Sequence, residues 1–143
     1  MAMDMKRKLV SIVSAMGVAA GLVVVAAGPA AASPGCTIAG AIAAANGSIV
    51  GMPMSSSGGI HCHLQQGYAS PAVKVLQQSI RRCYGINIVA DGRFGPLTRN
   101  AVLTVQRREG ISADGVYGPQ TRDHMAHALI AWEEQPPAGC ARL

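Results

Sequence analysis

The tripeptide His61-Cys62-His63 is the first candidate for chemistry, because it places a thiol beside two imidazoles. A cysteine with a histidine base is typical of a nucleophilic enzyme, and the same side chains bind zinc. Zinc ligands usually follow C-x2-4-C or H-x3-5-H spacings, which this tripeptide does not match. His124 and His127 are better explained as an exposed helix face than as metal ligands. We therefore expect no enzyme activity, no metal site and no cofactor.

The four cysteines are expected to form disulfides. An even number of cysteines in an exported chain indicates bonds made in an oxidising compartment. Four cysteines allow three pairings, and the sequence alone leaves all three open. We favour Cys36 with Cys62 and Cys83 with Cys140, since the second bond would tie the end of a helix to the C-terminal tail.

The N-terminus has the organisation of a secretory signal peptide. Basic residues 6–8 precede an apolar run over residues 9–27, and small residues follow, with Ala30 and Ala32 at a small-x-small site. We predict a signal peptide over residues 1–32, cleaved after Ala32. An uncleaved membrane anchor is an alternative, because the run approaches the roughly 20 residues that span a bilayer. A lipoprotein at Gly35-Cys36 is a second alternative.

The mature chain from Ser33 has room for one small domain with its own core. It carries nine basic and six acidic side chains, a formal net charge of +3. This mild charge, on an exported chain without a basic and aromatic ladder, disfavours nucleic-acid binding. Residues 33–68 are rich in Gly, Ala and Ser and are expected to form a loosely ordered, irregular lead-in. The folded domain is predicted over residues 69–133, and a tail over residues 134–143.

Three helices are predicted, each beginning at a proline. Ser70-Pro71 begins the first, which ends at Gly85, and Gly95-Pro96 begins the second, which ends at Gly110. Gly118-Pro119 begins the third, which is expected to end before Pro136. Its apolar stripe is formed by Met125, Leu129 and Trp132. The predicted fold class is all-α, a compact three-helix bundle stapled by disulfides.

An internal repeat contains three of the arginines and two of the aspartates. Residues 91–99 and 114–122 share the pattern D-G-x-aromatic-G-P-x-T-R, offset by 23 residues. Asp-Gly makes a tight turn, and Gly-Pro begins the next helix. The aromatic residue, Phe94 or Tyr117, is expected to fold back over the helices and anchor the turn. Each repeat is therefore a loop that leads into a helix.

These residues resemble the peptidoglycan-binding domain family, found attached to cell-wall hydrolases and in small secreted proteins. The resemblance covers residues 66–132 and includes residues 73–78, both repeats, Gln106 and Gly110. It implies a three-helix bundle without catalytic machinery. Cys83 and Cys140 add a bond that the family pattern does not require.

The resemblance implies peptidoglycan as the ligand, whose stem peptides carry several carboxylates. Helix N-termini and arginine side chains both favour such anions. The candidate ligand contacts are Arg93, Arg99, Tyr117, Gln120, Arg122, Tyr84 and Gln106. The competing interpretation is structural: both aspartates form turns, Phe94 is core, and Gln77 and Gln106 bridge loops to helices.

The sequence thus predicts a secreted, monomeric protein that associates with the cell wall and binds peptidoglycan without cleaving it. It has no membrane association after the signal peptide is removed. The alternative is a secreted interaction module that binds or inhibits a protein such as a cell-wall hydrolase. An exposed basic groove at the repeats would favour peptidoglycan, and a contiguous apolar patch would favour a protein partner.

Overall fold

The computed structural model describes residues 32–130 and 139–143. The predicted signal peptide, apart from its last residue, and Trp132 therefore lie outside the described residues. Within these two ranges no helix combines the length and the apolar character needed to cross a membrane.

The helix α1 (Pro71–Tyr84) begins and ends where the sequence predicts. The Ser70 side chain accepts a hydrogen bond from the backbone N–H of Val73 at 3.3 Å and so caps the first turn. Gly85 ends the helix in the left-handed conformation, with φ of 65°. The apolar face of α1 is buried through Val73, Leu76 and Ile80.

The helix α2 (Pro96–Arg108) also follows the prediction, with Gly95 before it and Gly110 in the left-handed conformation after it. It buries Ala101, Val102 and Val105. Together with α1, Phe94 and Tyr117, these side chains form the larger of two apolar clusters.

The third helix is much shorter than predicted. The helix α3 (Pro119–His124) has six residues, and the chain leaves it at Met125 with extended dihedral angles. The next backbone N–H groups bond to α1 side chains instead of continuing the helix: Ala126 to the Tyr84 hydroxyl at 2.7 Å and Ala128 to the Ser79 hydroxyl at 3.1 Å. Tertiary hydrogen bonds thus replace the predicted last turns.

The residues after α3 form a strand. The strand β3 (His127–Ala128) pairs in antiparallel fashion with β4 (Cys140–Ala141). The Cys83–Cys140 disulfide holds β4 against the end of α1. The predicted apolar stripe is therefore not helical at Leu129, whose N–H donates to the Gly139 carbonyl.

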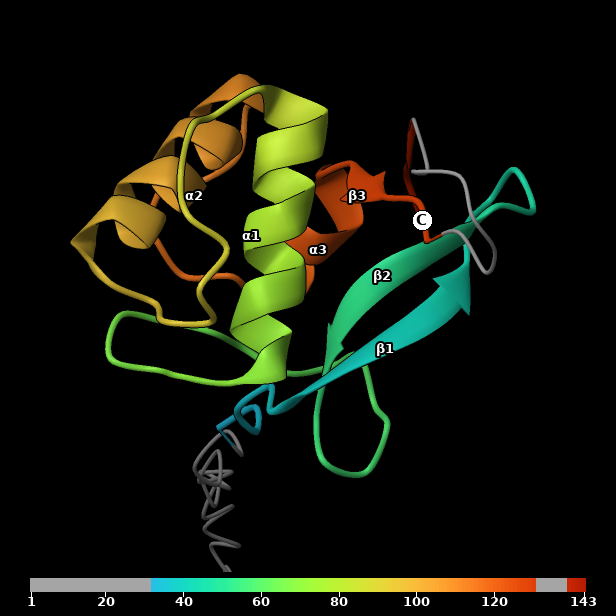
Figure 1. Cartoon of the computed structure of the whole chain (residues 1–143), viewed down its shortest axis with the longest axis horizontal. Helices are drawn as coiled ribbons and strands as arrows, with labels where there is room; N and C mark the ends of the chain where they lie inside the picture. Colours follow the sequence, from blue (N-terminus) through green and yellow to red (C-terminus); the bar gives the residue numbers. More distant parts are fainter. Residues whose placement is uncertain (1–31, 131–138) are drawn as a thin grey trace, which may run out of the picture. The chain divides into compact units, whose positions relative to one another are not determined.

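The segment before α1 is not irregular, and the prediction of an all-α bundle is wrong. The strands β1 (Ile38–Ala43) and β2 (Ile49–Met54) form an antiparallel hairpin in which Ile38 faces Met54 and Ala43 faces Ile49. Figure 1 shows this hairpin beside α1. β1 has two isoleucines, at positions 38 and 42, among four alanine and glycine residues, whose low strand propensity obscured the strand pattern.

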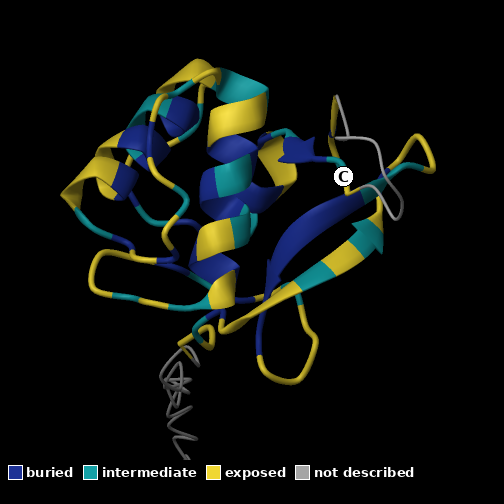
Figure 2. Ribbon diagram, in the orientation of Figure 1, coloured by how far each residue is buried: buried dark blue, intermediate teal, exposed yellow. Residues whose placement is uncertain are grey.

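The hairpin has its own apolar cluster. Val50, Met52 and Met54 of β2 are almost completely buried, together with Ala44 and Ala141. Figure 2 shows β2 buried along its length, whereas β1 is largely exposed or intermediate. The domain boundary predicted between residues 68 and 69 remains a prediction.

The structure contains the two disulfides that the sequence analysis favoured. Cys36 and Cys62 join the chain just before β1 to the chain after β2, with Cα atoms 5.1 Å apart. Cys83 and Cys140 join the last turn of α1 to β4, with Cα atoms 5.8 Å apart. The first bond closes the hairpin segment, and the second secures the C-terminal strand.

Candidate functional site

A buried glutamine organises the first repeat. The Nε2 atom of Gln77 lies 3.1 Å from Asp91 Oδ1, 2.9 Å from the Arg93 carbonyl and 2.9 Å from Thr98 Oγ1. Its Oε1 atom accepts a hydrogen bond from the Gly92 N–H at 2.9 Å. One side chain of α1 thereby fixes both the turn and the start of α2.

The second repeat has the same arrangement around Gln106. Its Nε2 atom lies 2.8 Å from Asp114 Oδ1, 2.9 Å from the Val116 carbonyl and 3.0 Å from Thr121 Oγ1. Its Oε1 atom accepts a hydrogen bond from the Gly115 N–H at 2.9 Å. Gln77 and Gln106 are each 1% exposed, so they act inside the protein.

The glycine in each turn is required by conformation and space. Gly92 and Gly115 both have φ of 77°, which side-chain-bearing residues adopt rarely. A Cβ atom at Gly92 would lie 3.2 Å from the Ser70 carbonyl, and one at Gly115 would lie 2.9 Å from Cγ of Arg99. Arg99 of the first repeat therefore crosses the surface to the second turn.

The aspartates of the repeats form turns, as the structural interpretation predicted. Asp91 Oδ1 accepts the Arg93 N–H at 2.9 Å, and Asp114 Oδ1 accepts the Val116 N–H at 2.9 Å. The Arg93 N–H and then the Gln77 amide hold the pKa of Asp91 below its ordinary value.

The aromatic residues bind both turns to the segment that precedes α1. Leu64 and Tyr117 exchange two backbone hydrogen bonds of 2.8 and 2.9 Å. The Phe94 N–H donates to the Tyr68 carbonyl, and the Gly67 N–H donates to the Phe94 carbonyl. Phe94 is 2% exposed and Tyr117 is fully buried, which confirms that both rings anchor their loops in the core.

The surface at the first turn is hollowed on two sides of Arg93. A cavity of about 310 Å³ is lined by residues of the turn and by Val89 and Leu97. A second cavity of about 200 Å³ lies between Arg93 and Tyr68. Val89 is 73% exposed and Leu97 is 74% exposed, so apolar and cationic groups meet at this turn.

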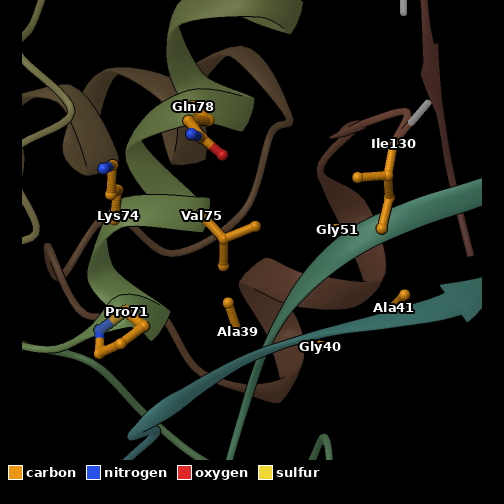
Figure 3. Close-up of a pocket in the computed structure, with 9 residues that line it drawn as sticks. All are labelled: Ala39, Gly40, Ala41, Gly51, Pro71, Lys74, Val75, Gln78 and Ile130. Atoms are coloured by element: carbon orange, nitrogen blue, oxygen red, sulfur yellow. The ribbon is translucent and has the colours of Figure 1, made fainter. Parts of the chain in front are cut away.

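A larger groove lies between α1 and the hairpin, a region in which we expected no binding site. Its volume is about 530 Å³. Figure 3 shows side chains of α1 on one side and the small residues of β1 and β2 on the other. The lining residues of α1 are Pro71, Lys74, Val75 and Gln78. The sequence does not predict this groove, because one of its two walls is the hairpin, a segment that we expected to be irregular.

The comparison with known families concerns the part of the chain that contains both turns. Residues 69–125 match the sequence model of the family described as "Putative peptidoglycan binding domain". This part of the chain is thus similar to that family. We refer to residues 69–125 as the family-matched domain. The hairpin, the Cys36–Cys62 disulfide and strands β3 and β4 lie outside the match.

Three solved structures resemble part of the chain. A peptidoglycan-binding protein from Clostridioides difficile, in complex with glutamine hydroxamate, is 28% identical, with a TM-score of 0.45 over 58% of this chain and 53% of that one. A fused Zn-dependent amidase, peptidase and peptidoglycan-binding protein from Clostridium acetobutylicum is 37% identical, with a TM-score of 0.40 over 41% of this chain and 26% of that one. A Burkholderia AP3 phage endolysin is 34% identical, with a TM-score of 0.40 over 41% and 22%.

This chain thus spans about half of the first of these proteins and about a quarter of the other two. No curated protein matches it.

Six of the seven predicted ligand contacts fall into two groups, and Tyr84 is intermediate in burial. Arg93, Arg99 and Gln120 are exposed. Tyr117, Gln106 and Arg122 are at most 4% exposed and contact other parts of the protein, so they present almost no surface to a polymer. The sequence pattern could not separate these groups, because the same repeat position is exposed in Arg99 and buried in Arg122.

Arg122 and Tyr84 have internal partners. Arg122 donates to the Ile60 carbonyl at 2.9 Å and to Asp123 at 2.7 Å, which lowers the pKa of the Asp123 carboxyl. Tyr84 is half-buried and donates to Glu109 at 2.6 Å. Burial, followed by that hydrogen bond, raises the pKa of the Tyr84 hydroxyl.

Each residue of the His61-Cys62-His63 tripeptide contacts a different part of the protein. Cys62 is bonded to Cys36, so its thiolate is not available as a nucleophile or a ligand. The Nε2 atom of His63 lies 2.8 Å from the Tyr68 hydroxyl oxygen, and the Nδ1 atom of His61 lies 3.4 Å from Nη1 of Arg122. Among the described residues, no three His, Cys, Asp or Glu side chains gather as a metal site.

Proposed function

We propose that this chain is a secreted protein that binds bacterial peptidoglycan without cleaving it. The observation that carries the proposal is the family match, which includes both turns and their organising glutamines. Secretion is supported by the signal-like N-terminus and by two disulfides, which persist in oxidising compartments. The protein would then associate with the cell wall.

The exposed face of the domain offers suitable chemistry for an anionic ligand. Arg93 precedes α2, Arg99 extends from α2 toward the second turn, and Gly95 provides no side chain to cap the free N–H groups of the helix. A helix N-terminus and nearby guanidinium groups both stabilise carboxylates. We retain Arg93, Arg99 and Gln120 as proposed ligand contacts, because these three side chains reach the surface.

Co-sedimentation with insoluble sacculi tests this function. The oxidised protein should be retained while the turbidity of the suspension stays constant. Arg93→Gln should reduce retention by about fivefold, as expected for one partly solvated charge-assisted contact. Arg107→Gln removes the same charge from an exposed position of α2 that lines none of the described cavities, and it should bind normally. A protein that is not retained, or that clears the suspension, would refute the proposal.

A second candidate function is recruitment or inhibition of a protein such as a cell-wall hydrolase. The exposed apolar side chains Val89 and Leu97, which line one cavity beside the first turn, favour it. In that case a Leu97→Ser variant should lose the protein partner, and sacculi alone should not retain the wild type.

A further inference from the structure

The groove between α1 and the hairpin is open because α1 packs more extensively on β2 than on β1, whose residues are exposed or only partly buried. Gly51 of β2 permits this close packing, since a Cβ atom there would lie 2.8 Å from Val75. Ala39 and Ala41 of β1 remain exposed. The floor of the groove is therefore formed by glycine and alanine, and it accepts small apolar groups without displacing any large side chain.

A cationic surface adjoins this floor. Lys74 and Gln78 line the groove and also line a second cavity of about 440 Å³, which continues to Arg81 and Arg82. Positions 74, 78 and 81 follow one another along a single face of α1. The two ion pairs among the described residues involve Arg122 and Arg142, so no described carboxylate pairs with these cations.

We propose that this composite groove binds the stem peptide of peptidoglycan, an inference that rests on the proposed function. A stem peptide combines the methyl groups of alanine with free carboxylates on an extended backbone. The methyl groups would lie on the floor at Ala39 and Ala41, and a carboxylate would bind Lys74 or Arg81. Gln78, between the two regions, would offer an amide to the peptide backbone.

The shape and lining of the groove favour this occupant over other wall polymers. Its volume of about 530 Å³ is within the roughly 300–1,000 Å³ that is usual for small-ligand sites. Among residues 32–130 and 139–143, no aromatic side chain lines either cavity, so this part of the chain offers no flat surface on which a sugar ring would stack. A polymer of glycerol phosphates would satisfy the cations but would leave the apolar floor without a partner.

The site is an addition to the family-matched domain. Pro71, Lys74 and Gln78 belong to residues 69–125, whereas Ala39, Gly40, Ala41 and Gly51 come from the hairpin outside the match. The Cys36–Cys62 disulfide ties the ends of the hairpin segment together and so supports that wall.

Equilibrium binding of the soluble stem pentapeptide to the oxidised protein tests the assignment. Lys74→Gln removes a cation at the junction of the two cavities, and Ala41→Leu fills the floor from an exposed position. Each variant should raise the Kd by about five- to tenfold. Arg107→Gln, an exposed helical position outside both cavities, should leave the Kd unchanged. The unfolding midpoints of all three variants should remain close to that of the wild type.

Two further probes distinguish the ligand sources. The peptide-free disaccharide and a poly(glycerol phosphate) should bind weakly and without dependence on Ala41. Equal binding of the pentapeptide by every variant, or tighter binding of either other probe, would overturn the assignment. Retention on sacculi without pentapeptide binding would remove this groove from the account but leave the proposed function standing. Failure to bind sacculi as well would remove both.

Discussion

The two repeat turns have the same internal hydrogen bonds but different surroundings. Gln77 and Gln106 each bind an aspartate, a backbone carbonyl, a threonine hydroxyl and a glycine N–H. The first turn leads into α2, with 13 residues, and the second into α3, with six. The repeated residues therefore determine the turn, whereas the length of the helix depends on what packs around it.

The repeated arginine shows the same difference most clearly. Arg99 is exposed, whereas Arg122 is buried and donates to the Ile60 carbonyl, 62 residues earlier in the chain. The first turn thus has the exposed Arg93 beside it, whereas the exposed Arg99 lies against Gly115 of the second turn. The second turn is part of the internal frame. Equal positions in a repeat can therefore be exposed in one copy and buried in the other.

Removing either glutamine should have the largest effect on stability. Gln77→Leu and Gln106→Leu each leave several buried polar groups without a partner, so each should lower the free energy of unfolding by about 2–4 kcal/mol. Chemical denaturation of the oxidised proteins measures this. Gln120→Leu, at an exposed position of α3, should change it by less than about 0.5 kcal/mol.

The two glutamine variants should be destabilised to a similar extent, because their bonds are equivalent. A loss confined to one variant would show that the turns differ energetically as well as in their surroundings. That result would contradict the shared-frame interpretation.

The second turn should also make the stability of the protein depend on pH, although this effect is smaller. His127 is fully buried, and its Nε2 atom lies 2.9 Å from the Arg122 carbonyl. Burial lowers the pKa of this imidazole below its ordinary value of 6.5. As the pH falls through about 6.5, the unfolded chain takes up the proton before the folded chain does, so stability is present above this pH and is lost below it. Thr104 occupies the equivalent position after the first turn and does not titrate.

Thermal unfolding between pH 8 and pH 5 checks this prediction. The melting temperature of the wild type should fall across this range more steeply than that of His127→Gln, whatever the absolute stability of the variant. Parallel curves would show that His127 does not carry the pH dependence. Asp91 and Asp123 contribute to the pH dependence of stability in a separate, more acidic range, because the pKa of each carboxyl is lowered from 3.8. Their contributions to stability are lost as the pH falls below about 3.8.

Local signals predicted the helix starts correctly. Ser70-Pro71, Gly95-Pro96 and Gly118-Pro119 each begin a helix, because capping and proline preferences act over a few neighbouring residues. The end of α3 could not be predicted in the same way. Met125 and Leu129 have helical spacing, but hydrogen bonds to Tyr84 and Ser79 of α1 fix an extended chain there. Such partners are distant in sequence.

The candidate site was only partly visible in the sequence. One interpretation of the sequence assigns structural roles to the aspartates, aromatic residues and glutamines of the turns, and the structure has these residues in such roles. The burial of Arg122 could not be predicted from the repeat, because Arg122 bonds to the Ile60 carbonyl, which is distant in sequence. Arg99, at the equivalent position, is exposed. The groove beside α1 could not be predicted without β1, because that strand forms one of its walls. The alanines and glycine of β1 show no clear strand pattern.

The most direct test of the different roles of the two turns compares Arg99→Met with Arg122→Met in retention on sacculi and in melting temperature. Arg99→Met should lower retention by about fivefold with a melting temperature within about 3 °C of the wild type. Arg122→Met should lower the melting temperature by roughly 5–10 °C, for a loss of about 1–2 kcal/mol, yet bind normally at a temperature where it is folded. Unchanged retention in Arg99→Met, together with lost retention in folded Arg122→Met, would contradict the account.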